Sequence, residues 1–356
     1  MCWYSARARF GVMGQFQSKL FWLIGMGLLV RQYRSWDRAE RYAAAATAAA
    51  KETDADRFER RIALASARVG YSPDDPEAHS ALARAYFDAL MPHVLKVSPG
   101  TSWKDAVPST YAEKYVVPGL RSSAAARAAC PHFAAAHMRL ALNREFFTAA
   151  EPASAYFARV KRLAPCDPEA WFASGLEAFE RGDLEAATND WKQSLSLDMR
   201  QLEPTLKIAA RKMSTERIRD RLLPDDTTVL LAAAHALYPN QIEQKVERKP
   251  FLTRVQQIAT HKSNPGVSDL VALAQVEYEI GNRDRALKAW KMAVNVAPYD
   301  TVLRAKYARW LESEELIEPL VSELEWLRQM GAGGSNITDR LDAARHALDL
   351  KKIIDK

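Results

Sequence analysis

A helical hairpin that recurs along the chain constrains the fold of this protein more than any other sequence feature. The stretch WFASGLEAFERGDLEAATNDW, residues 171–191, holds two segments of helical periodicity separated by Gly182-Asp183. A shift of 99 residues superimposes this stretch on a second one, with Gly182 on Gly281, Ala187 on Ala286 and Trp191 on Trp290. Because three different residues return at the same offsets, the pattern indicates an internal repeat.

The residues around the first hairpin specify where its helices begin and end. Asp167 is a good N-cap because its carboxylate accepts from free N–H groups, and Pro168 suits the first helical turn. We therefore predict a helix from Pro168 to about Arg181. It ends at Gly182, since glycine tolerates a left-handed exit, and Asp183 caps the next helix.

A shift of 34 residues brings a further helix boundary into register. It places Pro165 on Pro131 and Trp171 on His137, and His79 occupies the same slot in an earlier segment. We interpret both histidines as packing residues for this reason. The small and aromatic residues of each hairpin form an apolar stripe, which a neighbouring hairpin must cover.

This pattern resembles the tetratricopeptide repeat (TPR) family, whose units place small and aromatic residues on two helices and then a proline, about every 34 residues. The match is specific over 168–201 and 267–300 and degenerate near 76–131, 200–265 and 300–331. The resemblance implies an all-α, right-handed superhelical solenoid of antiparallel helix pairs with a C-terminal capping helix. It assigns helix packing to Trp171, Gly175, Gly182, Ala187, Trp191, Gly281, Ala286, Trp290 and Pro298.

The rhythm of the repeats divides the chain into three parts. We predict a basic and apolar N-terminal segment over 1–33, TPR-like repeats over 34–335 and the capping helix over 336–356. Insertions near 92–110 and 239–249 interrupt the repeats, each between the two helices of a pair. Loops of this length inside a compact array are either functional or tolerated.

The N-terminal segment is a candidate membrane anchor. Residues 20–30, LFWLIGMGLLV, are eleven uncharged residues, whereas a bilayer core needs about 20 apolar ones. Arg31 and Arg34 follow at once without a small-x-small cleavage site, which disfavours a cleaved signal peptide. The flanking bases slightly favour a cytoplasmic location for the repeats. In the alternative, these residues form a buried first helix and the protein is soluble in the cytoplasm.

The positive net charge does not indicate nucleic-acid binding once it is located. The first 50 residues carry seven Lys or Arg and two Asp or Glu, which is +5 of the total of +6. The other 306 residues therefore sum to +1, and the basic character belongs to the N-terminus. We expect no nucleic-acid partner.

The sequence carries no recognisable catalytic or metal-binding motif. No phosphate loop, dinucleotide fingerprint, H-E-x-x-H or G-x-S-x-G is present, and the seven histidines are scattered. The three cysteines have no second Cys/His pair at metal-ligand spacing. We therefore predict a protein that is not an enzyme and that uses no cofactor and no metal.

The resemblance also indicates which residues face the concave groove that first helices of such arrays form. These positions hold mainly aromatic and aliphatic side chains, which suit a helix or an extended apolar segment of a protein or peptide partner. The lysine and asparagine clamp of chaperone-binding family members is absent. In the alternative, the same residues are buried against the insertions or neighbouring helices. The predicted groove residues are Arg84, Phe87, Met138, Leu142, Glu145, Phe172, Leu176, Phe179, Val271, Gln275 and Tyr278.

Two functions follow as hypotheses from these observations. The first is a non-enzymatic protein-protein interaction scaffold, tethered to a membrane through its N-terminus. The second is the soluble regulatory tail of a larger membrane enzyme, such as a polysaccharide polymerase or ligase. An upstream in-frame membrane region would favour the second hypothesis.

Overall fold

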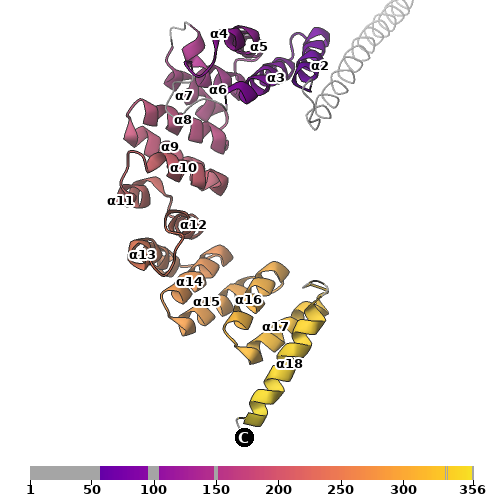
Figure 1. Ribbon diagram of the computed structural model, residues 1–356, viewed down its shortest axis with the longest axis vertical. Helices are drawn as coiled ribbons and strands as arrows, with labels where there is room; N and C mark the ends of the chain where they lie inside the picture. The colour runs from indigo at the N-terminus through magenta and orange to yellow at the C-terminus, as the bar shows by residue number, and fades with distance from the viewer. Residues whose placement is uncertain (1–56, 95–103, 148–150, 333, 335, 355–356) are drawn as a thin grey trace, which may run out of the picture. The chain divides into compact units, whose positions relative to one another are not determined.

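The computed structural model describes residues 57–94, 104–147, 151–332, 334 and 336–354, and the regular structure in these ranges is entirely helical. The chain divides between Gly182 and Asp183 into two compact units, each with helices packed as consecutive pairs (Figure 1). The all-α fold of TPR-like helix pairs is thus confirmed. The predicted anchor, residues 1–33, lies outside the described residues.

The first unit is built from helices that pack in chain order, with α2 on α3, α3 on α5 and α6 on α7. A π-helix, η1, leads directly into α5, and a 3₁₀ turn, η2, follows α6. The helices are α2 (Arg57–Tyr71), α3 (Pro76–Val94), α4 (Ser109–Tyr111), η1 (Ala112–Val116), α5 (Val117–Ala129), α6 (Ala134–Leu142), η2 (Arg144–Phe146), α7 (Ala153–Leu163) and α8 (Pro168–Glu180).

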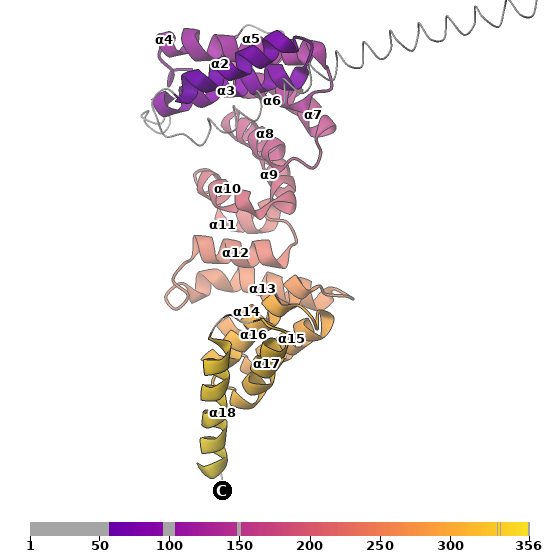
Figure 2. The same cartoon turned by 90° about the vertical axis from the view of Figure 1, so that its right-hand side faces the viewer.

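The second unit continues the same plan, and its last three pairs are α12/α13, α14/α15 and α16/α17 (Figure 2). The final helix, α18, packs on α17. The helices are α9 (Leu184–Leu197), η3 (Met199–Gln201), α10 (Leu202–Ala209), α11 (Thr215–Arg217), η4 (Ile218–Leu222), α12 (Thr227–Leu237), α13 (Lys245–His261), α14 (Val267–Glu279), α15 (Arg283–Val296), α16 (Thr301–Ser313), α17 (Ile317–Gln329) and α18 (Ile337–Ile354).

The turns inside the pairs repeat in conformation. Gly182 and Gly281 have φ of 89° and 94°, in the left-handed region that the turn requires. Each donates its N–H to a carbonyl three residues earlier, at 3.1 and 3.0 Å. Glu315, which follows Gly281 by 34 residues, has φ of 56°. The turn between α16 and α17 therefore keeps the repeat conformation without its glycine.

The junctions between pairs are closed by a hydrogen bond that also recurs. The Trp171 indole N–H donates to the carbonyl of Pro165, six residues earlier, at 2.8 Å. His79 and His137 hold the same position and place Nε2 2.7 and 2.8 Å from the carbonyls of Pro73 and Pro131. The Arg304 Nε donates to the Pro298 carbonyl at 2.8 Å. The two histidines thus each form a structural hydrogen bond at the junction between consecutive helices, in agreement with their expected role as packing residues.

Aspartate caps begin several of the helices after these junctions. Asp167 accepts from the N–H of Glu169 at 3.0 Å, which confirms the predicted start of α8. Asp75 and Asp300 accept from the N–H two residues later at 2.9 and 3.0 Å. These carboxylates satisfy N–H groups that have no partner within the helix.

Small and aromatic residues of the repeat fill the cores. Ala187, Ala286 and Trp191 are fully buried, and Trp290 stacks on Tyr307 of the next helix with ring centroids 5.8 Å apart. Gly175 is buried within α8. Trp171 is only partly buried and lies beneath the Lys161 ammonium, 5.0 Å from its ring centre. Large and small side chains of the repeat are thus buried together in densely packed cores.

Both predicted insertions are shorter than expected where the structure describes them. α3 continues through Pro92 to Val94, and residues 95–103 lie outside the described ranges. α13 begins at Lys245 and contains Pro250 inside the helix, so the second interruption ends before 249. In the described part of the chain, no helix has the length and apolar character that a bilayer crossing requires.

Candidate protein-binding groove

The first helices of the last three pairs line a groove of about 690 Å³ in the second unit. α12, α14 and α16 supply its walls, as first helices do in arrays of this kind. We call it the α12–α16 groove. Its lining residues are Thr228, Leu231, Ala232, His235, Val267, Ser268, Val271, Ala272, Gln275, Asp300, Val302, Leu303 and Lys306.

The centre of this groove is apolar and its rim offers a further apolar contact. Leu231, Ala272 and Leu303 are buried, whereas Val302 on the rim is 64% exposed. Hydroxyl and amide groups of the lining supply hydrogen-bonding capacity beside this apolar surface, among them Gln275. Such a surface suits a partner segment with an apolar side chain on one face and polar groups on the other.

A hydrogen-bonded triad holds His235, one of the lining residues, in the wall of the α12–α16 groove. His235 places Nε2 2.8 Å from one oxygen of Glu279, and Arg248, which is 1% exposed, donates to the other oxygen at 2.6 Å. Arg248 also donates to the carbonyl of Tyr238 at 2.7 Å. Burial acts to raise the pKa of Glu279, but the hydrogen bonds from His235 and Arg248 outweigh it and hold this pKa below its usual range. The ionised carboxylate therefore orients the imidazole at the groove wall.

Aromatic side chains pack at the same C-terminal end of α14. Tyr278 contacts Trp310 edge to face, with ring centroids 6.2 Å apart. A hydrogen bond to Glu314 raises the pKa of the Tyr278 hydroxyl. Glu314 also pairs with Arg283 at 3.0 Å. This contact set gives Tyr278 a defined position one turn beyond Gln275.

The structure brings two of the predicted groove residues together in the α12–α16 groove. Val271 and Gln275 both line it, and Tyr278, 41% exposed, follows on the same helix. Residues of α12 and α16 that face them were not predicted, because 200–265 and 300–331 match the repeat pattern poorly. Asp226, which caps α12 through the N–H groups of Thr228 and Val229, is a sequence signal that could have located the first of these helices.

The predicted residues of the first unit divide into exposed and packed positions. Arg84 and Leu142 are exposed. Phe87 places its ring against Gly119, where an added Cβ would lie 3.0 Å from it, and Met138 packs on the first unit's core. Packing therefore accounts for the last two side chains.

The remaining four positions of the first unit are also partly engaged. The Glu145 carboxylate accepts from the N–H of Lys104 at 3.1 Å, which holds the end of the first insertion. Phe172 and Leu176 are half-buried, and Phe179 is 4% exposed and thus lies inside the protein. Burial against neighbouring helices, the alternative raised by the sequence, describes Phe179, whereas Glu145 is exposed and bonded to the end of the first insertion.

No group of three or more His, Cys, Asp or Glu side chains within the described ranges is arranged to hold a metal ion. The described histidines at 79, 137 and 235 each have a hydrogen-bond partner in the packing of the helices.

Comparisons with known proteins return structures of TPR proteins at low sequence identity. No family model matches the chain, and no curated protein matches it. Yeast Tom70 shares 14% identity over 85% of this chain and 63% of its own, with a TM-score of 0.33. The Cut9–Hcn1 hetero-tetramer of APC/C shares 12% over 83% and 64%, also at 0.33. A TPR protein of Thermus thermophilus shares 17% over 78% and 98%, at 0.20.

This chain thus spans less than two thirds of the length of the first two structures. Because the TM-scores are low, the TPR-like character of the chain rests on its own helix pairs, glycine turns and recurring junctions. Helix-pair repeats of this class typically bind proteins and are usually non-catalytic.

Proposed function

We propose that this protein is a non-enzymatic scaffold that binds a segment of a protein partner in the α12–α16 groove. The observation that carries the proposal is the apolar centre of this groove, enclosed by three successive first helices. A volume of about 690 Å³ lies within the roughly 300–1,000 Å³ typical of sites that enclose small ligands or side-chain clusters.

The chemistry of the lining selects the class of segment. An amphipathic helix or an extended strand would place an apolar side chain over Leu231, Val271 and Leu303, where it loses contact with water. Lys306 and Gln275 are exposed and lie toward the rim, so polar groups of the same segment would meet them there. His235, held in the groove wall by Glu279, is already oriented, which reduces the ordering that binding requires.

Site-directed photo-cross-linking in cells tests this proposal. A photo-reactive amino acid at Val302, which is 64% exposed on the groove rim, should cross-link to the partner segment. The matched control is Val296 on α15, which is 56% exposed and does not line the groove. Mass spectrometry of the cross-linked peptide would identify the segment.

A substitution that should block the groove completes the test. Val302→Glu places a charge at the mouth of an apolar site and should abolish the cross-link from a reporter placed at Gln275, whereas Val296→Glu should leave it intact. Equal cross-linking from positions 302 and 296, or an unchanged product in the Val302→Glu protein, would refute the groove as the binding surface.

We propose in addition that residues 1–33 attach the scaffold to a membrane, with its repeats in the cytoplasm. Support comes from the eleven uncharged residues at 20–30 and the arginines that follow them. Cell fractionation with an alkaline carbonate wash, with and without residues 1–33, separates the possibilities. If the full chain resists extraction and the deletion is soluble and folded, the segment is an anchor. If both forms are soluble, the attachment proposal fails while the groove proposal stands.

A further inference from the structure

A second cleft lies in the second unit and shares no residue with the α12–α16 groove. α9 lines one side of it and α11 with η4 lines the other, around a volume of about 670 Å³. We call it the basic cleft because its Lys and Arg side chains, unlike most of its carboxylates, are not engaged in hydrogen bonds within the described part of the chain. Its lining residues are Glu185, Thr188, Asn189, Lys192, Glu216, Arg217, Asp220 and Arg221.

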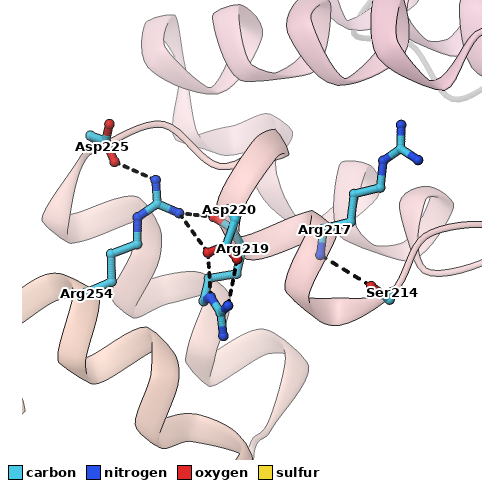
Figure 3. Close-up of polar contacts among 6 residues, drawn as sticks. All are labelled: Ser214, Arg217, Arg219, Asp220, Asp225 and Arg254. Carbon is cyan, nitrogen blue, oxygen red and sulfur yellow. Dashed lines mark hydrogen bonds and ion pairs between the residues drawn. The ribbon is translucent and has the colours of Figure 1, made fainter.

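One carboxylate of the basic cleft is held in an arginine network (Figure 3). Arg219 donates through Nε and Nη2 to both oxygens of Asp220, each at 2.7 Å. Arg254 lies between Asp220, at 3.7 Å, and Asp225, at 2.5 Å, and it also donates to the Arg219 carbonyl. The hydrogen bond from Arg219 is the main cause of the lowered pKa of Asp220. This carboxylate therefore has little capacity left for the cations of the lining.

A second carboxylate is engaged in capping. Hydrogen bonds from its own backbone N–H and from the Ser214 hydroxyl lower the pKa of Glu216. Ser214 in turn accepts from the N–H of Arg217 at 3.3 Å, as an N-cap does. Within the described residues, Glu185 is thus the lining carboxylate for which the structure shows no hydrogen bond or ion pair.

The cations of the basic cleft are not engaged in this way. Lys192, Arg217 and Arg221 make no side-chain hydrogen bond or ion pair to the residues that the structure describes. Figure 3 shows the Arg217 guanidinium pointing away from the arginine network, bonded to Ser214 only through its backbone. Lys192 and Arg221 act on Asp225 and Asp220 only as through-space charges, so the guanidinium and ammonium groups keep their hydrogen-bonding capacity for a ligand.

The surroundings extend this positive character. A further cleft, distinct from the basic cleft and of about 430 Å³, is lined by residues of η4 and α13, among them Lys249, Arg219 and Arg254. Along the chain, residues 207–221 carry six Lys or Arg and two Asp or Glu, a local charge of +4. An elongated anionic ligand could therefore contact both sides of η4.

We propose that the basic cleft binds an acidic segment of a protein partner, whose side-chain carboxylates pair with Lys192, Arg217 and Arg221. Guanidinium groups bind carboxylates through two parallel hydrogen bonds, and these pairs are stronger than neutral ones. A nucleic-acid backbone or an anionic bilayer is disfavoured because Glu185, Glu216 and Asp220 are interspersed among the cations and would repel a continuous row of phosphates. A polypeptide can place its carboxylates beside the cations alone.

Binding of a defined acidic peptide tests the proposal. The full-length chain is titrated with fluorescein-labelled octaglutamate and with octaglutamine by fluorescence anisotropy. The test protein carries Arg217→Gln and Arg221→Gln. The matched control carries Arg285→Gln and Lys288→Gln, two exposed residues of α15 that do not line the cleft.

We expect octaglutamate to bind the unaltered chain and the control with the same affinity. Its dissociation constant for the test protein should be at least roughly tenfold higher. Glu185→Gln should tighten binding, because it removes the carboxylate that opposes the ligand. Since the substituted arginines are exposed, circular dichroism should be unchanged. Equal affinity for the test protein and the control, or equal binding of octaglutamine, would overturn the proposal. The proposal would also be overturned if the unaltered chain bound phosphatidylserine vesicles but not octaglutamate, and the test protein lost the binding to vesicles.

Discussion

Substitution of Gly281 by alanine isolates the energetic contribution of the left-handed turn between α14 and α15. An added Cβ at this position would meet no heavy atom within 4 Å, so no steric clash contributes. The residue has φ of 94°, however, where an L side chain crowds its own backbone. This crowding costs about 1–2 kcal/mol. Alanine recovers about 0.4–1 kcal/mol because it restricts the unfolded chain. We expect a net destabilisation of about 1 kcal/mol.

Two matched substitutions sharpen this prediction. Gly70 in α2 also has no heavy atom within 4 Å of an added Cβ, but its φ is not positive. Gly70→Ala should therefore stabilise α2 by about 0.5–1 kcal/mol. Glu315→Gly should stabilise the turn between α16 and α17 by about 1 kcal/mol, because Glu315 holds φ of 56° with a side chain attached. The Gly→Ala substitution is thus expected to lower the free energy of unfolding at Gly281 and to raise it at Gly70.

Hydrogen exchange measured by mass spectrometry suits this test, because stability in helix-repeat arrays is distributed over local units. A loss of about 1 kcal/mol should raise exchange in α14 and α15 about fivefold in the Gly281→Ala protein. Unchanged exchange there, or slower exchange in the Gly281→Ala protein than in the unaltered chain, would refute the argument from φ. Faster exchange around Glu315→Gly would do the same for the turn without glycine.

Three further perturbations follow from single contacts. Trp191→Ala removes a fully buried side chain and should cost about 3–5 kcal/mol in a urea melt; a loss below about 1 kcal/mol would contradict its place in the core. Trp171→Phe keeps the ring but removes the bond to the Pro165 carbonyl, so the same melt should show a loss of about 0.5–1.5 kcal/mol. The pKa of Glu279 is lowered in the folded protein, so its contribution to stability is present above the unfolded pKa and is lost as pH falls through the folded value. In melts of Glu279→Gln measured between neutral and acid pH, this part of the stability loss should be absent; a loss equal to that of the unaltered chain would contradict the role of the Arg248–Glu279 pair.

The repeat could be predicted from sequence where one residue type performs one task. Asp167 indicates a helix N-cap and Gly182 a left-handed turn, because few other residue types suit these positions as well. The structure has the cap and the turn where they were expected. Glu315 shows why the unit over 300–331 matches the repeat pattern poorly, since the surrounding helices impose on it a conformation that its side chain disfavours and that glycine holds elsewhere.

The functional surfaces were less predictable because they depend on neighbours that the repeat pattern does not specify. Val271 and Gln275 were placed through a well-matched unit, whereas the α12 wall of the groove belongs to a degenerate one. In the basic cleft, charge totals concealed the site, because residues outside 207–221 carry compensating carboxylates. Its character depends on which carboxylates are already bonded, such as Asp220, and this requires three-dimensional contacts.

The bonds to the proline carbonyls carry a consequence for how the chain tolerates changes in length. The four junctions that they close are all connected by four residues, at 72–75, 130–133, 164–167 and 297–300. A donor six residues after its acceptor can close only a linker of this size. The seven-residue connection at 238–244 lies instead within a pair, between α12 and α13, whereas the junction at 262–266 has five residues and lacks the bond to a proline carbonyl among the described contacts. New segments or whole domains should therefore be accepted more readily at a hairpin tip such as 238–244, while one extra residue at any of the four closed junctions would break its bond to the proline carbonyl.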